Sequence, residues 1–477
     1  MHYNNNASQV KRELLIKMIR LMIDGKLEQG IDRIPFEMTS NGRNPIRCCV
    51  HHDREILRTR LLASLGFSVE GYQDNGTTLA SFALKALQRD CIEAPMPTVL
   101  DEACNACISS QFLVTIACQG CLARPCVLNC PKKAVSMLGG HAVIDKDRCA
   151  NCGICLQVCP YHAIVKIPIP CEEACPVGAI SKDSHGKERI DYDKCVFCGN
   201  CMRECPFGAV MDKSQIIDVL KAKKAGKKLS ALFAPAVAGQ FRAPIGKLVS
   251  ALEKAGFDAV YEVALGADIT AGKEAHEFTE RMKKGEPFMT TSCCTAYVET
   301  VRKHLPVLAE RVSGTRTPMH YTAEISAREK PDHLRVFIGT CLAKRKEGLD
   351  DPLVDYVLSA EELGALFVAM DIEVADLEER VLLRPARAGG RSFAWVGGVS
   401  GAVKTWLVPG TDFRPETVDG LARDSMKTLK AWAEGKHAGN FLEVRACRGG
   451  CVAGPSVIAN PKVAAIQLKK AAEAGVG

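Results

Sequence analysis

Two stretches of the sequence share one cysteine pattern: CANCGICLQVCP, residues 149–160, and CVFCGNCMRECP, residues 195–206. Each reads C-x2-C-x2-C-x3-C-P, in which three thiolates hold one face of an iron-sulfur cubane and the cysteine before proline reaches the neighbouring cluster. Structural zinc also uses C-x2-C pairs, but the third cysteine and the C-P ending argue against zinc. The two stretches therefore predict 4Fe-4S clusters.

Weaker copies of the pattern surround these two stretches. They are CQGCLARPCVLNCP at 118–131, CEEACP at 171–176 and CNAC at 104–107. Residues 104–205 hold sixteen cysteines, the number that four clusters need. The tails CPKKAV, CPYHAI, CPVGAI and CPFGAV indicate an internal repeat of the ferredoxin half-unit.

The crossing rule for the fourth cysteine predicts which thiols share a cluster. The four predicted sets are Cys118, Cys121, Cys126 with Cys159; Cys149, Cys152, Cys155 with Cys130; Cys195, Cys198, Cys201 with Cys175; and Cys104, Cys107, Cys171 with Cys205. A row of clusters is typical of a wire that carries electrons from the surface to a buried site.

Length and composition indicate an ordinary globular protein. The chain has 477 residues, enough for two or three domains, and 25% of them are charged. No apolar stretch is long enough to cross a bilayer, and no signal peptide is evident. Together with 24 cysteines at metal-ligand spacings, this predicts an oxygen-poor cytoplasm.

The net charge of +7 is partly local, in a run of lysines at 221–228. This run is either a solvated helix end or a docking patch for an acidic carrier such as a ferredoxin. We find no nucleic-acid recognition module and no basic stripe with interleaved aromatic residues, so nucleic acid is not an expected partner.

Periodicity divides the chain into three predicted parts. Residues 1–95 form a mostly helical cap that begins with an amphipathic helix at 8–30. Residues 96–220 form the ferredoxin-like α+β region with up to four clusters. Residues 221–477 alternate between buried strands, at 230–239 with a turn at Pro235, at 259–265 and at 334–341, and helices such as 245–257. This last pattern predicts an α/β domain with a mostly parallel sheet.

Five cysteines remain beyond residue 290, in three separate loops. The loops are TTSCCT at 290–295, GTCLAKRKE at 339–347 and RACRGGC at 445–451. Scattered buried thiols are one explanation, because free cysteine behaves as a small hydrophobe. Adjacent cysteines and a glycine-spaced pair fit that explanation poorly, so we expect the three loops to meet in the fold.

In these three loops the sequence resembles the iron-only (FeFe) hydrogenases, over about residues 230–458. The ferredoxin-like front end agrees with this resemblance. The divergent group labelled B is the most similar, on RCCVHHDREILR at 47–58, CEEACPVGAI at 171–180 and a third loop without the usual glycine-glycine-glutamine ending. The resemblance implies a two-lobed catalytic domain after the ferredoxin-like region.

The resemblance also implies an active-site cluster and its chemistry. A fifth 4Fe-4S cubane would be joined through a cysteine sulfur to a two-iron unit with carbon monoxide, cyanide and a bridging dithiolate. Carried over by position, the cubane ligands are Cys294, Cys341 and Cys447, and Cys451 is the bridge. The implied activity is the reversible interconversion of protons and electrons with dihydrogen, with a ferredoxin as electron partner and maturation proteins that supply the two-iron unit.

Further roles follow from the same resemblance. Cys293 would pass protons to the two-iron unit, and Lys344 would hydrogen-bond one of its cyanides, with Glu347 on the same helix face. Ala234 and Pro235 match a backbone segment that contacts the unit.

A proton path to solvent would run from Cys293 through Glu274, Ser313, Glu277 and Arg281. Glu274, Glu277 and Arg281 share one face of a predicted helix at 270–284. From spacing alone they form a surface ion-pair ladder; the resemblance favours the proton path.

The loops depart from the family pattern at three places. In the first loop, Thr295 stands where proline is usual. In the second loop, Gly339-Thr340 replaces the usual methionine-proline or glycine-proline. In the third loop, Arg445 stands where methionine is usual. We expect a cation at 445 to raise the cluster potential. These departures keep two alternatives open: a hydrogen-sensing or electron-transfer subunit with low turnover, or a hydrogenase-like iron-sulfur assembly scaffold.

The remaining cysteines have simpler explanations. Cys48 and Cys49, followed by His51 and His52, form either a fifth metal site or a structural corner whose side chains point apart. Cys91 is expected to be a buried free thiol. The glycines of VGGVSGAV at 396–403 are wrongly spaced for a dinucleotide fingerprint and are expected to allow close packing near the active-site cluster.

Overall fold

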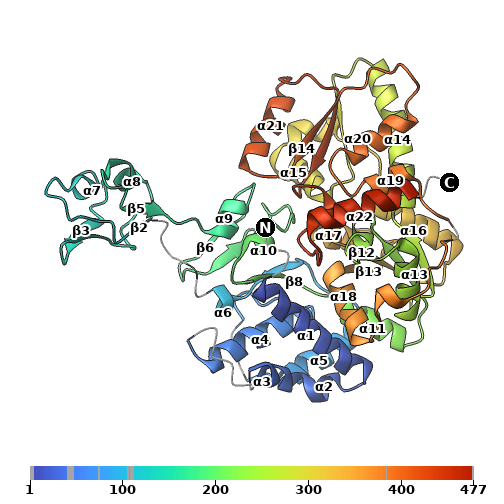
Figure 1. Cartoon of the computed structure of the whole chain (residues 1–477), viewed down its shortest axis with the longest axis horizontal. Helices are drawn as coiled ribbons and strands as arrows, with labels where there is room; N and C mark the ends of the chain where they lie inside the picture. Colours follow the sequence, from blue (N-terminus) through green and yellow to red (C-terminus); the bar gives the residue numbers. More distant parts are fainter. Residues whose placement is uncertain are drawn as a thin grey trace.

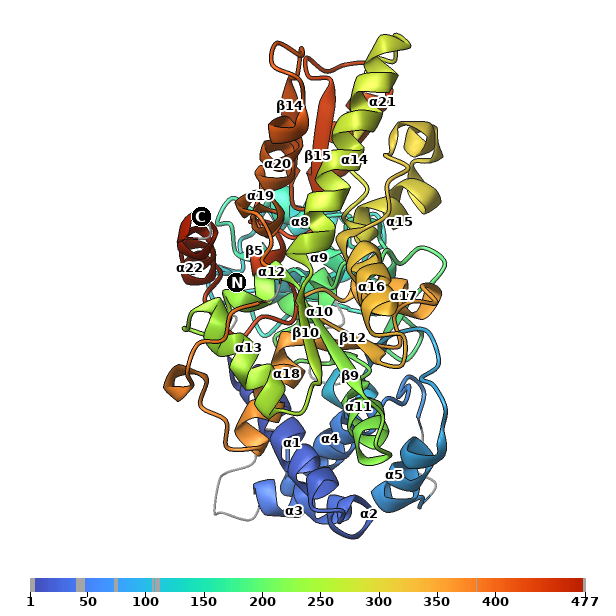
Figure 2. The ribbon, with the colours of Figure 1, turned by 90° about the vertical axis from the view of Figure 1, so that its right-hand side faces the viewer.

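The computed structural model describes residues 5–39, 48–72, 76–104, 107, 112–382 and 384–474. Figure 1 shows N-terminal helices at the bottom, a small lobe that projects to the left, and a larger two-lobed body on the right; Figure 2 shows the body from its right-hand side. None of the helices in these ranges is both long and apolar enough to cross a membrane.

Within the described residues, five α-helices precede the cysteine-rich region. They are α1 (Asn6–Ile23), α2 (Leu27–Gly30), α3 (Ile34–Thr39), α4 (Val50–Ser64) and α5 (Leu79–Gln88). The helix predicted at 8–30 is present but divided, because Gly25 takes the left-handed conformation that commonly ends a helix. The apolar face of α1 is buried as its periodicity predicts, through Leu14, Leu15, Met18, Ile19 and Met22.

The cysteine-rich region consists of short helices and small antiparallel sheets. Its elements are β1 (Pro97–Val99), α6 (Asp101–Cys104), β2 (Phe112–Val114), α7 (Pro125–Leu128), β3 (Val135–Leu138), β4 (His141–Ile144), α8 (Ile154–Val158), β5 (Ile164–Lys166), α9 (Pro170–Ala174), β6 (Ile180–Lys182), β7 (Glu188–Ile190), α10 (Asn200–Glu204) and β8 (Val210–Asp212). The pairs β2–β5 and β3–β4 build the projecting lobe, whereas β1–β8 and β6–β7 lie against the body (Figure 1).

The sequence repeat is also a structural repeat. In each C-P-x-x-A tail the residue before alanine has a positive φ; these residues are Lys133, His162, Gly178 and Gly208. In each tail the alanine N–H donates to the cysteine sulfur, in the pairs Ala134–Cys130, Ala163–Cys159, Ala179–Cys175 and Ala209–Cys205 at 3.1–3.4 Å. Such donors stabilise a thiolate and tune the potential of a cluster bound to it.

In the part of the body that the structure describes there are two parallel sheets, and the order of elements confirms the predicted α/β domain. The elements are α11 (Ile216–Lys224), β9 (Leu229–Phe233), α12 (Pro235–Ala238), α13 (Ile245–Lys254), β10 (Ala259–Glu262), α14 (Ala264–Lys283), β11 (Met289–Thr290), α15 (Thr295–His304), α16 (Pro318–Glu329), β12 (Leu334–Gly339), α17 (Ala343–Asp350), β13 (Tyr356–Ser359), α18 (Ala360–Ala369), α19 (Ala388–Ser392), α20 (Gly398–Trp406), β14 (Pro415–Asp419), α21 (Arg423–Ala433), β15 (Phe441–Arg445) and α22 (Pro461–Ala474).

The two sheets define the two lobes of the body. The first has the order β10-β9-β12-β13 and the second the order β11-β15-β14, with every neighbouring pair parallel. Helix α14 runs from the first lobe into the second, as Figure 2 shows. The fold is therefore a ferredoxin-like α+β region followed by a two-lobed α/β domain.

The N-terminal helices share a hydrophobic core with the first lobe. Helix α1 packs against α18 and α11, and one cluster of buried apolar residues runs from Leu14 to β9, β12 and α18. The division of the chain near residues 95 and 220 stays a prediction, since this core crosses both boundaries.

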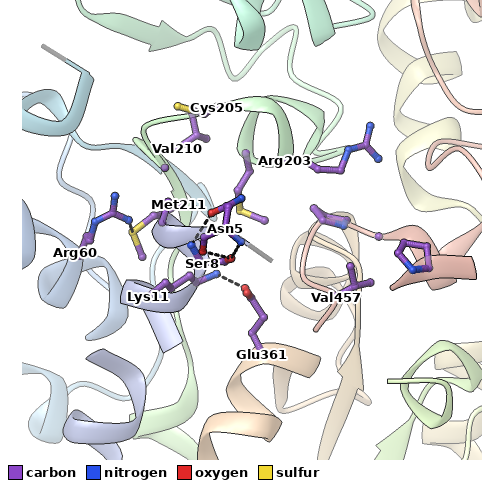
Figure 3. Close-up of a pocket in the computed structure, with 16 residues that line it drawn as sticks. Asn5, Ser8, Lys11, Arg60, Arg203, Cys205, Val210, Met211, Glu361 and Val457 are labelled. Carbon is purple, nitrogen blue, oxygen red and sulfur yellow. Dashed lines mark hydrogen bonds and ion pairs between the residues drawn. The ribbon is translucent and has the colours of Figure 1, made fainter. Parts of the chain in front are cut away.

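A buried network of charges reinforces the same junction. Lys11 lies 2.8 Å from Asp212 and 2.8 Å from Glu361, and Arg345 pairs with Asp212 at 2.8 Å and with Glu362. Figure 3 shows Lys11 and Glu361 in the cavity where α1 meets the iron-sulfur region. The network therefore ties the cap, β8 and the site helix α17 together.

Three sequence expectations differ from the structure. The strand predicted at 230–239 ends at Phe233, and the residues from Pro235 form the short helix α12. The strand predicted at 259–265 ends at Glu262, because the following residues begin the long helix α14. Cys91 was expected to be buried, and this is wrong, since its side chain is exposed in the loop after α5. A single apolar residue carries no information about its depth when no periodic element surrounds it.

Candidate functional site

Two neighbouring strands of the first sheet lead directly into predicted site segments. Strand β9 is followed by Ala234 and Pro235, and its parallel neighbour β12 is followed by Thr340 and Cys341. Carboxyl ends of parallel strands meet at one edge of a sheet, where α/β proteins place their ligands. The fold thus brings the second cysteine loop beside the Ala234-Pro235 segment.

The second sheet repeats this arrangement with the other two cysteine loops. Strand β11 leads to Cys293 and Cys294, and its parallel neighbour β15 leads to Cys447 and Cys451. Cys294 also lies at the start of α15, which fixes the end of the first loop.

The carboxyl edges of both sheets face one cavity. Its empty space, counted together with the adjoining open solvent, is about 860 Å³, and its lining is mostly apolar. Its lining includes Ala234, Pro235, Cys293, Cys294, Cys341, Lys344, Arg445, Cys447 and Cys451. The three loops therefore meet, as the sequence predicts, and scattered core thiols do not describe them.

Contacts between the loops hold the cavity together. The Thr340 hydroxyl donates to the Cys451 carbonyl oxygen at 2.6 Å, so the second and third loops are hydrogen-bonded. A Cβ atom at Gly454 would lie only 2.3 Å from the Thr340 carbonyl oxygen, so this close approach requires glycine. Thr340 thus links two loops where the usual proline, which lacks a hydroxyl, would not.

The four thiols predicted as cubane and bridge ligands influence one another. Burial raises the pKa of Cys341 to about 12, and the nearby Cys451 and Cys294 thiols add to this. Burial likewise raises the pKa of Cys447 and Cys294, again with contributions from their neighbours in the set. Thiols that resist ionisation in an apolar site are stabilised as thiolates when they bind a cationic iron centre.

Lys344 lines the cavity and is held by a fixed carboxylate. Its ammonium lies 2.6 Å from Glu347, which also accepts hydrogen bonds from the hydroxyls of Thr295 and Thr317. A carboxylate with three donors keeps the lysine side chain in one position at the cavity wall.

Arg445 brings a second cation to the cavity. Its guanidinium lies 3.6 Å from the Cys293 sulfur and 3.9 Å from the Cys451 sulfur. The partner carboxylate of Glu443 is fully buried, 3.0 Å away, and accepts from Ser400 and the Gly397 N–H at the start of α20. The glycine segment at 396–403 therefore packs near the site, as expected, and holds the counter-ion of Arg445.

Glu274 lies at the inner end of the predicted proton path. Burial raises its pKa to about 7, although the N–H and hydroxyl of Ser292 oppose this. Oε1 accepts both Ser292 donors, while Oε2 has no hydrogen-bond partner within the described part of the chain. Burial also raises the pKa of Cys293; the Arg445 cation opposes this rise, and the Glu274 carboxylate adds to it. Because Glu274 influences the thiol, the two groups are neighbours.

Glu277 and Arg281 lie one and two turns further along α14. Burial acts to raise the pKa of Glu277, but the Gly314 N–H, Ser313 and Arg281 together hold it below its usual value. The Ser313 hydroxyl lies 2.6 Å from Glu277, and Arg281 lies 2.7 Å away. Because Glu274 is fully buried, the row runs inward from solvent and is not a surface ion-pair ladder.

Three of the four predicted accessory thiol sets surround a cavity of their own. The lining residues include Cys175, Cys195, Cys198 and Cys201 of one set, Cys104, Cys107, Cys171 and Cys205 of another, and Cys130, Cys149, Cys152 and Cys155 of a third. In the remaining set, burial raises the pKa of Cys126, and the thiols of Cys159 and Cys121 contribute. The structure therefore gathers three sets in the predicted combinations and brings Cys121, Cys126 and Cys159 of the fourth close together.

The sets are also connected to one another and to the main cavity. Cys198 lines both its own cavity and the one between the lobes. Burial raises the pKa of Cys201, and the other thiols that add to this include Cys171 of the neighbouring set. A continuous series thus leads from the set of Cys104 through the set of Cys195 to the main cavity.

The thiol sets are not arranged around single ions. Among the described residues, no three His, Cys, Asp or Glu side chains are placed to hold one metal ion. Thiolates on a cubane stand further apart than the ligands of one tetrahedral zinc. Within the described residues, the side chains are therefore not arranged around a single zinc ion at the thiol sets, and a metal site at Cys48 and Cys49 stays a prediction.

Sequence reasoning missed several polar residues of the site. Ser292 and Thr315 connect the two glutamates, since the Ser292 hydroxyl donates to the Thr315 carbonyl oxygen and the Thr315 hydroxyl donates to Glu277. Thr317 and Glu443 were also not predicted. Their only sequence signal is proximity to named residues, because serine and threonine are common in loops.

Comparison with known families agrees with the geometry. The family described as "iron only hydrogenase large subunit, C-terminal domain" matches residues 227–455. A 4Fe-4S dicluster domain matches residues 170–209, and a 4Fe-4S binding domain matches residues 142–165. The domain order is the one that the two cysteine regions predict.

Two individual relatives are named as hydrogenases. The chain is 30% identical over 371 residues to the periplasmic [Fe] hydrogenase large subunit of Nitratidesulfovibrio vulgaris, covering 65% of this chain and 85% of that protein. It is 27% identical over 278 residues to iron hydrogenase 1 of Clostridium pasteurianum, covering 47% of this chain and 48% of that protein. A solved structure of [FeFe]-hydrogenase HydA1 from Chlamydomonas reinhardtii is 22% identical, covers 51% of this chain and 84% of that chain, and has a TM-score of 0.43.

The extent of these matches decides what they establish. The chain spans about half the length of the clostridial relative but most of the Nitratidesulfovibrio subunit. With its 4Fe-4S domains leading to a thiol-lined cavity between two α/β lobes, the chain belongs to the iron-only hydrogenase family.

Proposed function

We propose that the protein interconverts protons and electrons with dihydrogen at a two-iron unit in the main cavity. The observation that carries this proposal is the meeting of Cys294, Cys341, Cys447 and Cys451 beside a fifth thiol, Cys293, in a buried apolar space. Four thiols suit a cubane with one bridging sulfur, and the fifth is left for proton transfer.

The residues present fit such a group. Soft thiolates select iron-sulfur centres, and the cavity has space beyond the thiols for a further unit. Two fixed cations, Lys344 and Arg445, line it and would balance anionic ligands such as cyanide. When bound, the two-iron unit with its carbon monoxide, cyanide and dithiolate ligands supplies the metal chemistry on which dihydrogen is formed or split.

The chain itself would supply the protons. In our proposal, Cys293 exchanges a proton with the bound group, and the free Oε2 of Glu274 is the next acceptor. A pKa near 7 suits a carboxyl that both gives and takes protons at neutral pH. Glu277, with its hydroxyl partner Ser313 and its cation Arg281, continues the path toward solvent.

Electrons would enter at the projecting lobe. Residues 112–166 carry six Lys or Arg and only two Asp, so the lobe is basic. It also exposes large apolar side chains, among them Leu113 at 49%, Ile116 at 99%, Leu122 at 96% and Leu128 at 80%. Apolar contacts surrounded by basic residues suit a small acidic carrier such as a ferredoxin.

The lysine run at 221–228 is the weaker candidate for this docking surface. Lys221 donates to the carbonyl oxygen of Arg89 at the end of α5, Lys223 donates to that of Ala255 in the body, and Lys228 pairs with Asp332. The run closes the end of α11, on the opposite side of the molecule from the projecting lobe (Figure 1).

A second candidate function, hydrogen sensing or electron transfer with low turnover, is favoured by Arg445. A buried cation beside the site should stabilise the reduced cluster and so weaken its drive to reduce protons. An assembly scaffold without the two-iron unit is less well supported, because Cys293, Lys344 and the glutamate path are all present.

Spectroscopy with a matched variant tests the proposal. Protein matured anaerobically with hydrogenase maturation proteins should show infrared bands of carbon monoxide and cyanide. It should also consume and evolve dihydrogen with a reduced ferredoxin. Cys293→Ser should keep the bands and lose turnover by at least about 10²-fold, whereas Cys91→Ser, at an exposed thiol, should keep both.

The outcomes separate the candidate functions. Bands without turnover would favour the sensor, and absence of bands after full maturation would favour the scaffold. The cellular compartment is part of the proposal too: we place the protein in the cytoplasm, although the Nitratidesulfovibrio relative is named periplasmic.

A further inference from the structure

A compact cluster of reactive side chains lies outside the main site, at the start of α4. The Cys48 sulfur lies 3.9 Å from the Cys49 sulfur and 3.3 Å from Nδ1 of His52. The other ring nitrogen, Nε2, lies 3.2 Å from the Glu102 carboxylate on α6. The two cysteines do not point apart, so this is not the structural corner that the sequence left open.

The cluster has the parts of an activated nucleophile. A thiol stands beside an imidazole base, and a carboxylate orients the imidazole. The second thiol, Cys49, occupies the N-cap position of α4, a helix of 15 residues. Cys48 is exposed and Cys49 is partly exposed, so a small molecule can reach both.

The surroundings favour a thiolate on Cys49. The His52 backbone N–H holds the pKa of Cys49 below its usual value, while burial and the Asp53 carboxylate oppose this. The hydrogen bond with Cys49 raises the pKa of Cys48. These opposite shifts make Cys49 the more acidic of the two thiols.

We propose that Cys48 and Cys49 form a thiol–disulfide exchange centre that reacts with low-molecular-weight disulfides. The Cys49 thiolate attacks one sulfur of the disulfide R–S–S–R; that S–S bond breaks, a Cys49–S–S–R bond forms and RS⁻ leaves. Cys48 gives its proton to His52 and attacks the Cys49 sulfur, which releases a second RS⁻. One disulfide is reduced to two thiolates, and the two cysteines are oxidised to one disulfide.

The product disulfide should be easily reduced again. Adjacent Cα atoms are about 3.8 Å apart across a trans peptide, closer than the roughly 4.4–6.8 Å usual for disulfides. Disulfides that are exposed or under strain have more oxidising potentials and are typical of regulatory sites. The centre would therefore close only under oxidising conditions and reopen with mild thiols.

The centre is linked to the iron-sulfur region through one residue. His52 contacts both the carboxylate and the backbone carbonyl oxygen of Glu102, on the short helix α6 that ends at Cys104. Oxidation of Cys48 would remove the sulfur contact of His52, which orients this imidazole against α6. The structure thus places a disulfide-reactive pair next to a predicted cluster ligand.

Peptide mapping of the complete, cluster-loaded protein tests the proposal. The protein is incubated anaerobically with oxidised glutathione, its remaining thiols are alkylated, and it is digested with trypsin. Cleavage after Arg47 and Arg54 gives the peptide CCVHHDR, residues 48–54. We expect this peptide to lose two hydrogens, as a closed disulfide, at least about tenfold faster than the exposed Cys91 gains glutathione.

Single variants separate the two steps. Cys48→Ser should stop with glutathione bound to Cys49, and Cys49→Ser should react no faster than Cys91. His52→Gln should let the glutathione adduct accumulate, because the second step loses its base. Cys91→Ser should leave peptide 48–54 unchanged in rate.

Three results would overturn the proposal. The first is a peptide 48–54 that stays in the dithiol form while Cys91 reacts. The second is equal behaviour of Cys48→Ser and Cys49→Ser. The third is a metal ion on the purified protein that protects this pair until a chelator removes it. None of these depends on hydrogen turnover, so the test is independent of the proposed function.

Discussion

Replacing Arg445 with methionine, the residue usual in the family, should lower the potential of the active-site cluster. Arg445 lies 3.9 Å from the Cys451 sulfur and is buried. Two unit charges about 4 Å apart interact by about 4 kcal/mol at an effective dielectric constant of about 20. Charge spread over the cluster and the opposing Glu443 reduce this, and we take about half, ~2 kcal/mol.

This energy converts directly into a potential. For a one-electron couple, a tenfold change in equilibrium is 59 mV and about 1.4 kcal/mol, so ~2 kcal/mol corresponds to a fall of ~90 mV. The assay is a redox titration of anaerobically matured protein, followed by electron paramagnetic resonance. Infrared bands recorded alongside would report the state of the two-iron unit.

Two further variants make the result interpretable. Arg445→Met leaves the buried Glu443 carboxylate without its cation, which should also cost about 3–5 kcal/mol of stability. The double variant Arg445→Met with Glu443→Gln removes both charges and should show a smaller fall in the cluster potential. Arg448→Met changes an exposed arginine next to Cys447 and should leave the potential nearly unchanged. An unchanged potential in Arg445→Met, or an equal fall in Arg448→Met, would refute the electrostatic reasoning.

Three further predictions concern stability and the proton path. Burial raises the pKa of Glu274 from 4.5 to about 7, so its contribution to stability is complete below pH 4.5 and is lost as the pH rises through 7. Glu274→Gln should flatten this pH dependence, which is worth up to about 3 kcal/mol. Thermal denaturation across this pH range measures the difference. Arg345→Met should lower stability by about 3–5 kcal/mol, because it removes the arginine from the buried Glu362 carboxylate and leaves Asp212 with Lys11. Lys346→Met, at a partly exposed side chain, should cost under about 1 kcal/mol, and chemical denaturation compares the two. Ser313→Ala should slow hydrogen evolution about 10²-fold while the cluster potential stays the same; unaltered turnover would remove Ser313 from the path.

The cysteine loops and the ferredoxin repeat could be predicted because their chemistry imposes a spacing. Four thiols on one cubane require short, fixed intervals, and the C-P-x-x-A tails place an N–H on each sulfur by local geometry alone. The loops after β9 and β12 were also predictable, since buried strands and the turn at Pro235 are visible as apolar runs.

Other features were not predictable because they depend on distant contacts. The role of Thr317 rests on Glu347, thirty residues away, and Glu443 is identified only by its position beside Arg445. The shared core of α1 and the first lobe has no signature in either segment, because an amphipathic helix does not specify its partner.

The departures from the family pattern support one another. The Thr295 hydroxyl binds Glu347, which holds Lys344 at the cavity wall. Position 295 is the first residue of α15, where proline is tolerated, so the substitution adds a hydrogen bond without changing the backbone.

Thr340 and Arg445 follow the same logic. Thr340 replaces a residue without a hydroxyl and joins the second loop to Cys451, and Arg445 comes with its own buried counter-ion. If the cofactor site had been lost, selection would no longer maintain costly buried charges. Polar groups such as these would then be left without partners. Each altered residue instead makes a specific contact at the cavity, which favours a working site with retuned electrostatics over a site in decay.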